Sequence, residues 1–344
     1  MSKTHNNLFL QIYDFENLYN AYLKARKCKR YRKEVLKFTS NLEENLIIIQ
    51  NELMWKMYIP SRYREFYVYD PKKRLIQAPQ FKDRVIHHAL CNVIEPLFEK
   101  KFIYDSYACR KGKGTHAAVL RAQKFMRKLK RNHGNFYILK ADVSKYFQSI
   151  NPDILKSIIR RTISCRDTLW LIDTVIDENE QGLPIGALTS QLFANIYLNE
   201  LDHFIKDQLG IKAYVRYMDD FVIMHQDKQY LKGVLAEVRQ FLTHKLALAL
   251  NSKTQIYPYK HGLDFCGYRI WPTHILPRKR NVKKARRMFK TLKEKYANRI
   301  IDLSYIKPRL MSFLGYMKFC SGYFTSKNIL KELILQTWST PVIK

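Results

Sequence analysis

The chain has 344 residues, 47% of them hydrophobic, which allows a large core with two or three packed subdomains and excludes a disordered tail. The formal net charge is +31, from 61 Lys and Arg against 30 Asp and Glu. This excess is more than solubility requires and favours a polyanion partner, because each cation that meets a phosphate releases a counterion. On charge alone, a ribosomal-type or membrane-surface protein remains an alternative.

The spacing of the cysteines and the hydropathy of the chain indicate in which cellular compartment the protein works. The six cysteines are widely separated and form no C-x-x-C pair, which indicates neither a zinc site nor a disulfide framework. There is no run of 18 apolar residues and no apolar leader at the start of the chain. We therefore expect a soluble, cytoplasmic protein with no membrane span.

The N-terminal part is expected to be mostly helical. Residues 8–27 and 42–57 carry apolar side chains at three-and-four spacing, and so do residues 85–100. Between them, residues 64–84 resemble a β-hairpin, because apolar and aromatic runs flank "DPKKR", with Pro71 at a turn position.

The middle of the chain changes character. Residues 106–131 are a Gly/Lys loop that opens into a strongly basic helix. Residues 135–147 predict a strand and a turn, and residues 213–227 predict a strand, a tight acidic turn and a second strand. Between these two segments, a Gly/Pro loop leads into the apolar helix expected over residues 190–205.

Three carboxylates stand at the ends of these apolar strands. Asp142 ends the first, and Asp219 and Asp220 form the tip of the second pair. Carboxylates in such places are costly unless a cation neutralises them, and Mg²⁺ prefers oxygen ligands. Either motif alone would be an ordinary acidic turn or cap. Together they favour a two-metal site able to activate a 3′-hydroxyl and stabilise leaving pyrophosphate.

Residues 271–344 are expected to form a small helical tail. Its residues 278–299 contain eleven Lys and Arg but only one acid, Glu294. A solvated helix face usually mixes charges of both signs, so a phosphate-binding track is favoured.

These motifs resemble those of reverse transcriptases. "YMDD" at 217–220, preceded by "KADVSKYFQSI", resembles the active-site strands, and "KKRLIQAPQFKDRVIHHAL" and "SYACRKGKGTHAA" resemble two fingers motifs. "LNSKTQI" resembles the lysine-bearing segment and "FCGYRIWP" the primer grip. The resemblance implies an α+β, right-hand polymerase fold with fingers, palm and a small helical thumb. Its implied parts are an N-terminal helical extension (1–60), fingers (61–135), a palm (136–270) whose loop-helix 182–205 contributes to the nucleotide site, and a basic helical thumb (271–344).

The resemblance also implies catalytic roles. Asp142 and Asp219 would hold two Mg²⁺ ions, for which Mn²⁺ substitutes, with Asp220 and the carbonyl of Val143 as further ligands. Phe147 matches the aromatic steric gate that excludes a 2′-hydroxyl.

Cationic residues would bind phosphates. Lys73 and Arg74 match cations for the triphosphate of the incoming dNTP, because a guanidinium can bind two oxygens. Lys253 matches a lysine that protonates leaving pyrophosphate, and Arg110 and Lys113 would bind template or nucleotide phosphate. The other implied template or primer contacts are Tyr217, Met218, Gly267, Tyr268, Lys283, Lys284 and Arg287.

The loop before the apolar helix points to one branch of the family. Most reverse transcriptases have a Gln-Gly pair here followed by Ser-Pro, whereas this chain has Ile185-Gly186 and then Ser190-Gln191. The pattern I-G-x-x-x-S-Q resembles reverse transcriptases of diversity-generating retroelements, and it implies that Ile185, Gly186 and Gln191 bind the nucleotide. These bacterial and phage cassettes copy a template-repeat RNA into cDNA with errors at adenines, and the cDNA rewrites a target gene by mutagenic retrohoming. The implied partners are the template RNA, the RNA/cDNA duplex, dNTPs and a small basic accessory protein that forms a ring, in a bacterial host cell.

A physical argument supports a role for Ile185 in infidelity. Isoleucine has no hydrogen-bond donor or acceptor, so a bond that a glutamine would make near the nascent pair is lost. Such a bond is worth about 1 kcal/mol of discrimination, a several-fold change in error rate. Strong adenine-specific error therefore needs other residues or a partner as well.

Three alternatives remain open. The first is a group II intron- or retron-type reverse transcriptase without a mutagenic role. The second is a basic RNA-binding or defence protein that retains a catalytically inactive polymerase fold. The intact set of three acids argues against it. The third is an RNA-templated RNA polymerase. Phe147 at the steric-gate position argues against it, because it favours dNTPs.

Overall fold

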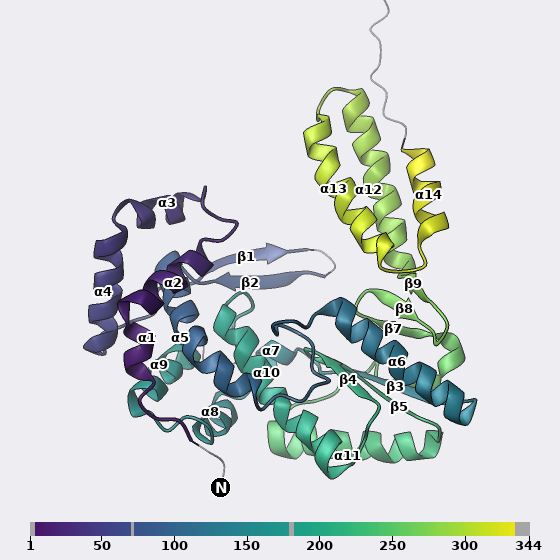
Figure 1. The fold of residues 1–344 in the computed structure, drawn as a ribbon, viewed down its shortest axis with the longest axis horizontal. Helices are drawn as coiled ribbons and strands as arrows, with labels where there is room; N and C mark the ends of the chain where they lie inside the picture. The colour runs from purple at the N-terminus through teal and green to yellow at the C-terminus, as the bar shows by residue number, and fades with distance from the viewer. Residues whose placement is uncertain (1–3, 70–71, 179–181, 334–344) are drawn as a thin grey trace, which may run out of the picture.

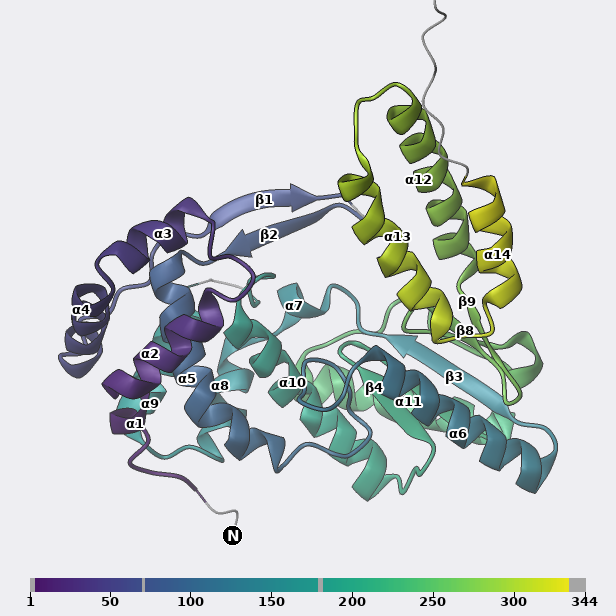
Figure 2. The ribbon, with the colours of Figure 1, turned by 45° about the horizontal axis from the view of Figure 1, so that its top comes forward.

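The computed structural model describes residues 4–69, 72–178 and 182–333. Figures 1 and 2 show an open arrangement in which N-terminal helices, a central sheet and a C-terminal helical bundle surround a gap, and a β-hairpin projects toward the bundle. The α+β class predicted from the sequence is confirmed. No helix in these residues is long and apolar enough to cross a membrane.

The N-terminal helices pack around a central one, α5. Asp14 separates the first two helices and caps the second, its carboxylate accepting a bond from the N–H of Asn17 (3.2 Å). Leu18 and Tyr22 of that helix are fully buried in the core that also contains α5. The helices predicted over residues 8–27, 42–57 and 85–100 are confirmed as α1 (Phe9–Tyr13) with α2 (Phe15–Ala25), α4 (Leu42–Met54) and α5 (Phe81–Glu99), and a further helix, α3 (Lys33–Ser40), lies between the first two of these segments.

The predicted hairpin is also confirmed. Strands β1 (Arg64–Val68) and β2 (Arg74–Ala78) pair antiparallel, with Arg64 opposite Ala78. The turn position predicted for Pro71 lies outside the described residues.

A four-stranded antiparallel sheet carries the acidic motifs. Its order is β4-β5-β3-β6, with bounds β3 (Tyr137–Asp142), β4 (Tyr214–Tyr217), β5 (Asp220–His225) and β6 (Gln255–Pro258). Alternate residues face two different cores: Leu139 and Ile223 pack with α11 (Lys228–Leu246), whereas Ile138 and Val222 pack with α6 (Thr115–His133). The predicted apolar helix, α10 (Leu188–His203), belongs to the first of these cores.

Short elements connect the sheet to its helices. They are α7 (Tyr146–Ser149), α8 (Pro152–Arg160), α9 (Arg166–Asp177), the π-helix η1 (Phe204–Gln208) and the 3₁₀ helix η2 (Tyr259–His261).

The C-terminal part differs from the prediction at its start. A three-stranded sheet, β7 (Leu263–Phe265), β8 (Tyr268–Ile270) and β9 (Ile275–Pro277), extends into the segment expected to be helical from residue 271. Ile275 pairs with Ile270, so the chain turns back on itself before any helix begins. The helices then follow as α12 (Lys279–Ala297), α13 (Leu303–Lys318) and α14 (Tyr323–Glu332), and residues 334–344 lie outside the described part.

Helix α12 buries one apolar face. Ala285, Phe289 and Leu292 are buried against Phe313 of α13 and Ile329 of α14. Its cations therefore occupy the exposed remainder of the helix.

Candidate active site

Two of the predicted carboxylates meet where strands β3 and β5 begin to diverge. The N–H of Val143 donates to the carbonyl of Asp219 (3.2 Å), and the N–H of Asn251 donates to the carbonyl of Asp142 (2.7 Å). The Asn251 amide also donates to Oδ2 of Asp142 (3.3 Å). Main-chain pairing on both sides of β3 thus fixes the acidic groups.

The carboxyl groups of Asp142 and Asp219 carry like charges that no nearby cation fully neutralises. Burial and the neighbouring charge of Asp142 raise the pKa of Asp219, and the two carboxyl groups lie within hydrogen-bonding reach of each other. The charge of Arg74, at the start of β2, acts in the opposite direction. Two carboxylates this close bind a proton or a cation, so the residues fit a divalent metal ion.

The third acid, Asp220, lies opposite Asp142 on the paired strand and also interacts with a lysine. Its Oδ2 is 3.5 Å from Nζ of Lys140, and its charge contributes to the raised pKa values of Tyr257 and Cys266. Burial raises the pKa of Asp220 to about 7. Within the described chain, no three His, Cys, Asp or Glu side chains gather into one metal-binding group. The role of Asp220 as a further metal ligand stays a prediction.

Replacement of Asp220 by asparagine should make stability less dependent on pH. Because the folded pKa is about 7 instead of 3.8, the neutral carboxyl stabilises the fold at low pH, and this contribution is lost as pH rises through about 7. The experiment is done without divalent ions. The free energy of unfolding of Asp220→Asn minus that of wild type should be about 1–3 kcal/mol larger at pH 8 than at pH 5. Urea unfolding at both pH values measures this difference. A difference that stays constant with pH would contradict it.

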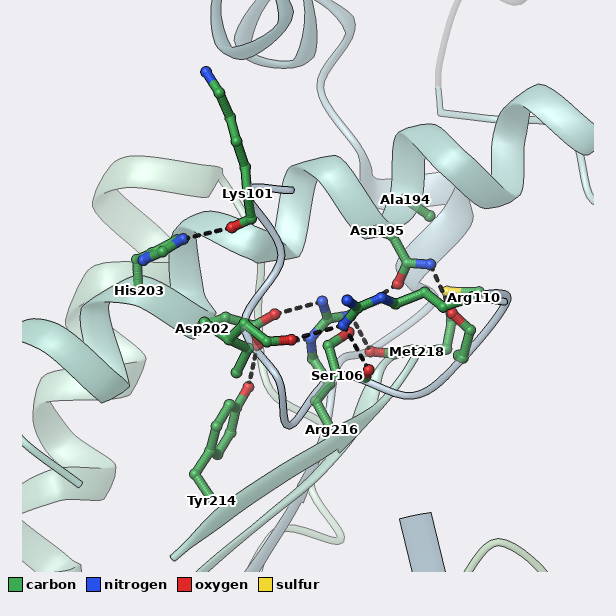
Figure 3. A network of polar contacts seen from close by, with 12 residues as sticks. Lys101, Ser106, Arg110, Ala194, Asn195, Asp202, His203, Tyr214, Arg216 and Met218 are labelled. Atoms are coloured by element: carbon green, nitrogen blue, oxygen red, sulfur yellow. Dashed lines mark hydrogen bonds and ion pairs between the residues drawn. The ribbon is translucent and has the colours of Figure 1, made fainter. Parts of the chain in front are cut away.

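The turn before Asp219 is held by a buried network of hydrogen bonds and an ion pair (Figure 3). The sequence did not predict this network. Arg216 is fully buried and binds Asp202 of α10 through Nε and Nη2 (2.7 and 2.6 Å). Its Nη1 donates to the carbonyl of Met218 (3.0 Å) and to Oδ1 of Asn195 (3.2 Å). Met218 has φ +55°, a left-handed conformation uncommon outside glycine, so the guanidinium holds an unusual turn directly before Asp219.

The same network reaches two further elements. Tyr214 donates its hydroxyl to Oδ1 of Asp202 (2.6 Å), and the Asn195 amide donates to the carbonyl of Ala108 (2.8 Å). The main chain of Arg216 pairs with residues 105 and 107 on the neighbouring loop. The one sequence signal for this network is a charged residue inside an otherwise apolar strand, "YVRY".

The loop that contains Ile185 is fixed by its main chain. The N–H of Leu183 donates to the carbonyl of Phe147 (2.7 Å), and the N–H of Gln77 on β2 donates to the carbonyl of Ile185 (2.9 Å). Gly186 has φ +134°, and a Cβ there would lie 3.0 Å from the carbonyl oxygen of Gln77. The structure thus brings Phe147 and Ile185 together with the base of the hairpin.

The other predicted nucleotide-binding residues are dispersed. Lys73 lies over the ring of Tyr67, with Nζ 4.4 Å from its centroid, and the exposed Arg74 influences Asp219 through its charge. Lys253 is exposed and lies in the turn that begins at Asn251. Gln191 lines a cavity together with Gly186 and with Ile76 of β2.

Two residues of the Gly/Lys loop that were predicted to bind phosphate make contacts within the protein instead. Arg110 binds Glu99 through Nε and Nη2, and its Nη1 donates to the carbonyls of Ile103 and Ser106 (2.6 and 2.8 Å). Its side chain is only 5% exposed, so the prediction that it binds a template phosphate is wrong in this structure. Lys113 donates to the carbonyl of Tyr104 (2.9 Å) and lies over that residue's ring.

The predicted primer contact Tyr268 is likewise an internal residue. It is 3% exposed, its hydroxyl lies 3.0 Å from Nε2 of His116, and its ring stacks on Tyr316. The prediction of direct primer contact is wrong, because the fold places this side chain of β8 between His116 of α6 and Tyr316 of α13. Gly267, with φ +88°, offers its carbonyl to the hydroxyl of Tyr316 (2.6 Å), which ties the strand turn to α13.

The remaining predicted contacts are accessible to different degrees. Tyr217 and Met218 are half-buried beside the acidic pair. Lys283, Lys284 and Arg287 are exposed on α12.

The fold and this site define a right-hand polymerase, and comparison with known proteins places it in a family. The model of the family "Reverse transcriptase (RNA-dependent DNA polymerase)" matches residues 69–270. The chain therefore belongs to the reverse transcriptase family and is an RNA-directed DNA polymerase.

Its relatives include intron-encoded proteins. Protein YkfC of Escherichia coli K12 is 26% identical over 276 residues, which cover 67% of this chain and 72% of that protein. Group II intron-encoded protein LtrA of Lactococcus lactis subsp. cremoris is 28% identical over 177 residues, 47% of this chain and 28% of that protein. Nuclear intron maturase 1 of Arabidopsis thaliana is 29% identical over 105 residues, 30% of this chain and 14% of that protein. The chain thus matches less than a third of the length of the last two.

Solved structures confirm the fold. Apo telomerase from Candida tropicalis superposes with a TM-score of 0.52 at 12% identity, over 82% of this chain and 60% of that one. At this identity the likeness concerns the fold alone.

Proposed function

We propose that this reverse transcriptase copies a template-repeat RNA into cDNA with errors at adenines, as part of a diversity-generating retroelement. The observation that carries the proposal is the apolar Ile185 in the loop fixed beside Phe147, within the pattern I-G-x-x-x-S-Q. A side chain without donor or acceptor there removes one hydrogen bond that could favour correct pairs.

In this mechanism, Asp142, Asp219 and the carbonyl of Val143, with Asp220 as a further ligand, would hold two Mg²⁺ ions, for which Mn²⁺ would substitute. When bound, such ions supply the charge that favours attack by the primer 3′-hydroxyl and departure of pyrophosphate. The chain's own residues position the substrates. Arg74 faces the triphosphate from the hairpin, and Phe147 lies under the sugar to exclude a 2′-hydroxyl.

We further propose where the nucleic acid lies. The exposed cations Lys283, Lys284 and Arg287 on α12 track the backbone of the RNA/cDNA duplex, because they stand on the exposed face of a helix with a large positive excess. A small basic accessory protein and the template-repeat RNA complete the assembly in a bacterial cytoplasm.

The second candidate is a group II intron- or retron-type reverse transcriptase without a mutagenic role. The similarity to LtrA and to nuclear intron maturase 1 favours it. Both candidates use the same catalytic residues, so copying accuracy distinguishes them.

The replacement Ile185→Gln should lower the error rate opposite template adenines several-fold, because one hydrogen bond is worth about 1 kcal/mol. Primer extension on an RNA template with all four bases, followed by sequencing of the cDNA, measures the rate. Ile185→Leu is the matched control, since it changes the shape but adds no donor or acceptor, and it should keep the wild-type rate.

Two results would count against the proposal. Unchanged adenine errors in Ile185→Gln would remove Ile185 from the explanation of infidelity. Accurate copying of adenines by the wild-type protein with its accessory protein present would support the second candidate instead.

A further inference from the structure

Helix α6 has one face on which all the charged side chains are cations. The helix contains six Lys and Arg and no Asp or Glu. Because successive residues of a helix are about 100° apart, five of these cations fall within about 120° of its circumference. They are called the α6 stripe here: Arg121, Lys124, Arg127, Lys128 and Arg131. A solvated face usually mixes charges of both signs, so a face of one sign indicates an anionic partner.

The α6 stripe points away from the palm sheet. The opposite side of the helix, which includes Ala122 and Met126, is buried in the core that α6 shares with the sheet. Figures 1 and 2 both show α6 in front of the sheet, on the outside of the molecule. Lys124, Lys128 and Arg131 are exposed. The stripe is therefore a surface separate from the acidic pair, which lies at the strand ends.

The acid beside the stripe is already neutralised. Asp105 is only 4% exposed and accepts bonds from Nε of Arg121 (2.7 Å) and Nζ of Lys206 (2.8 Å). At the other edge of the stripe, Nε of Arg127 donates to the carbonyl of Pro272 (2.8 Å). Since one carboxylate is shared by two cations, it does not cancel the charge of the three exposed cations between these edges.

Aromatic rings lie among the cations at the N-terminal end of the stripe. Tyr104 is 67% exposed, and its ring centroid is 3.6 Å from Nζ of Lys113 and 5.1 Å from the guanidinium carbon of Arg121. The same guanidinium carbon is 4.4 Å from the ring centroid of Phe125. Cations interleaved with exposed rings are typical of surfaces that bind nucleic acid, so RNA fits this surface better than an acidic protein does.

The shape of the stripe favours a double strand. Single strands are usually held in grooves where successive bases stack on rings. The stripe instead runs along the convex side of a helix, and its exposed cations from Lys124 to Arg131 extend over about 10 Å. A row of this kind can follow the regularly spaced phosphates of one strand of a double helix, in a contact that does not depend on base sequence.

We propose that the α6 stripe binds a double-stranded stem of the RNA molecule that contains the template. The phosphates of one strand of the stem lie along Lys124, Lys128 and Arg131. The inference rests on the reverse transcriptase activity, which takes RNA as its template, and is independent of the mutagenic role. A stem bound here keeps the RNA on the enzyme while another part of the same molecule is copied at the acidic pair.

The test measures how tightly a fluorescent RNA hairpin with a long stem binds when the active site is already occupied. A chain-terminated primer–template, the next dNTP and Mg²⁺ occupy the active site. The triple variant Lys124→Gln/Lys128→Gln/Arg131→Gln should bind the hairpin about tenfold or more weakly than wild type. The slope of log affinity against log salt should fall by about 2–3, because three phosphate-facing charges are lost. Glutamine is a good helix former, so α6 should stay folded.

The matched control is the triple variant Lys232→Gln/Arg239→Gln/Lys245→Gln on α11. These residues are exposed, and their replacement changes the net charge by the same amount. The control should bind the hairpin like wild type. Equal losses in both triple variants would show an effect of net charge alone and overturn the proposal. Wild-type affinity of the α6 variant for the hairpin would overturn it as well.

Other ligands give distinct results. The affinity of the α6 variant for primer–template and its KM for dNTP should equal those of wild type. A loss in either would assign the stripe to the primer–template duplex and overturn the proposal. An unstructured RNA strand of the same length should compete poorly with the hairpin, and equal competition would assign the stripe to single-stranded RNA instead. Primer extension by the wild-type protein tests the polymerase activity itself, separately from the stripe.

A second measurement uses the wild-type protein and needs no variant to fold. Exposed lysines are acetylated with and without the hairpin, again with the active site occupied, and the modified positions are identified by mass spectrometry. The hairpin should protect Lys124 and Lys128 but leave Lys232 and Lys245 reactive. Equal acetylation of Lys124 and Lys128 in both samples would overturn the assignment.

Discussion

Replacement of Asp219 by asparagine is expected to reduce DNA synthesis on an RNA template on the order of 10³-fold or more. The change keeps the size of the side chain but removes one of the two negative charges that the strand ends bring together. If the pair holds the metal ions, several kcal/mol of transition-state stabilisation are lost, and each 1.36 kcal/mol is a factor of ten in rate. Single-nucleotide incorporation at saturating dNTP and Mg²⁺ measures the effect.

The control for this variant is Asp177→Asn on α9, whose carboxylate pairs with Lys156 away from the acidic pair. It removes the same charge and should keep the wild-type rate. A rate for Asp219→Asn within tenfold of wild type would show that Asp219 is not required for the metal site. Binding of the primer–template should change little, because the loss concerns catalysis.

The second large effect is expected at Asp202. Replacing it with asparagine leaves the guanidinium of Arg216 fully buried without its counter-charge. Breaking a buried pair in this way costs about 3–5 kcal/mol, so the midpoint of urea unfolding should fall markedly. The rate of incorporation should fall as well, since Arg216 holds the carbonyl of Met218 before Asp219.

A triple variant separates stability from positioning. Asp202→Leu/Tyr214→Phe/Arg216→Met removes the ion pair together with the hydroxyl that donates to it, and apolar replacements of buried pairs are often neutral or stabilising. The triple variant should therefore regain most of the lost stability. Its incorporation rate should remain about tenfold or more below wild type, because the turn has lost the donor to Met218. A stable triple variant with the full wild-type rate would show that the turn holds its geometry without Arg216.

Much of the catalytic sheet could be predicted from local sequence. "NFYILKAD" shows a β-strand pattern that ends at an acid, and "VRYMDDFVIM" shows two strand patterns that meet at acids. All three segments form strands of one sheet. The three-residue strand β9 was missed because it is too short to show a period, and its pairing with β8 depends on a turn that ends at His274.

The errors at individual residues have a common cause. Arg110 comes directly before a segment of alternating lysine and glycine and looks exposed, but the fold brings Glu99 and two carbonyls around its guanidinium. Asn195 and Asp202 look like the polar positions of a surface helix, whereas α10 is buried on most sides and both residues face Arg216. Contacts between distant segments decide these roles, and no local pattern records them.

The main-chain anchoring of the loop around Ile185 has a consequence for how copying accuracy can evolve. Because the carbonyl of Ile185 and the N–H of Leu183 hold the loop, its path does not depend on which side chain stands at position 185. A change of a single codon can therefore alter the chemistry beside the nascent pair while the surrounding scaffold stays as it is. In a lineage under selection, error rate and folding stability could then vary almost independently at this position.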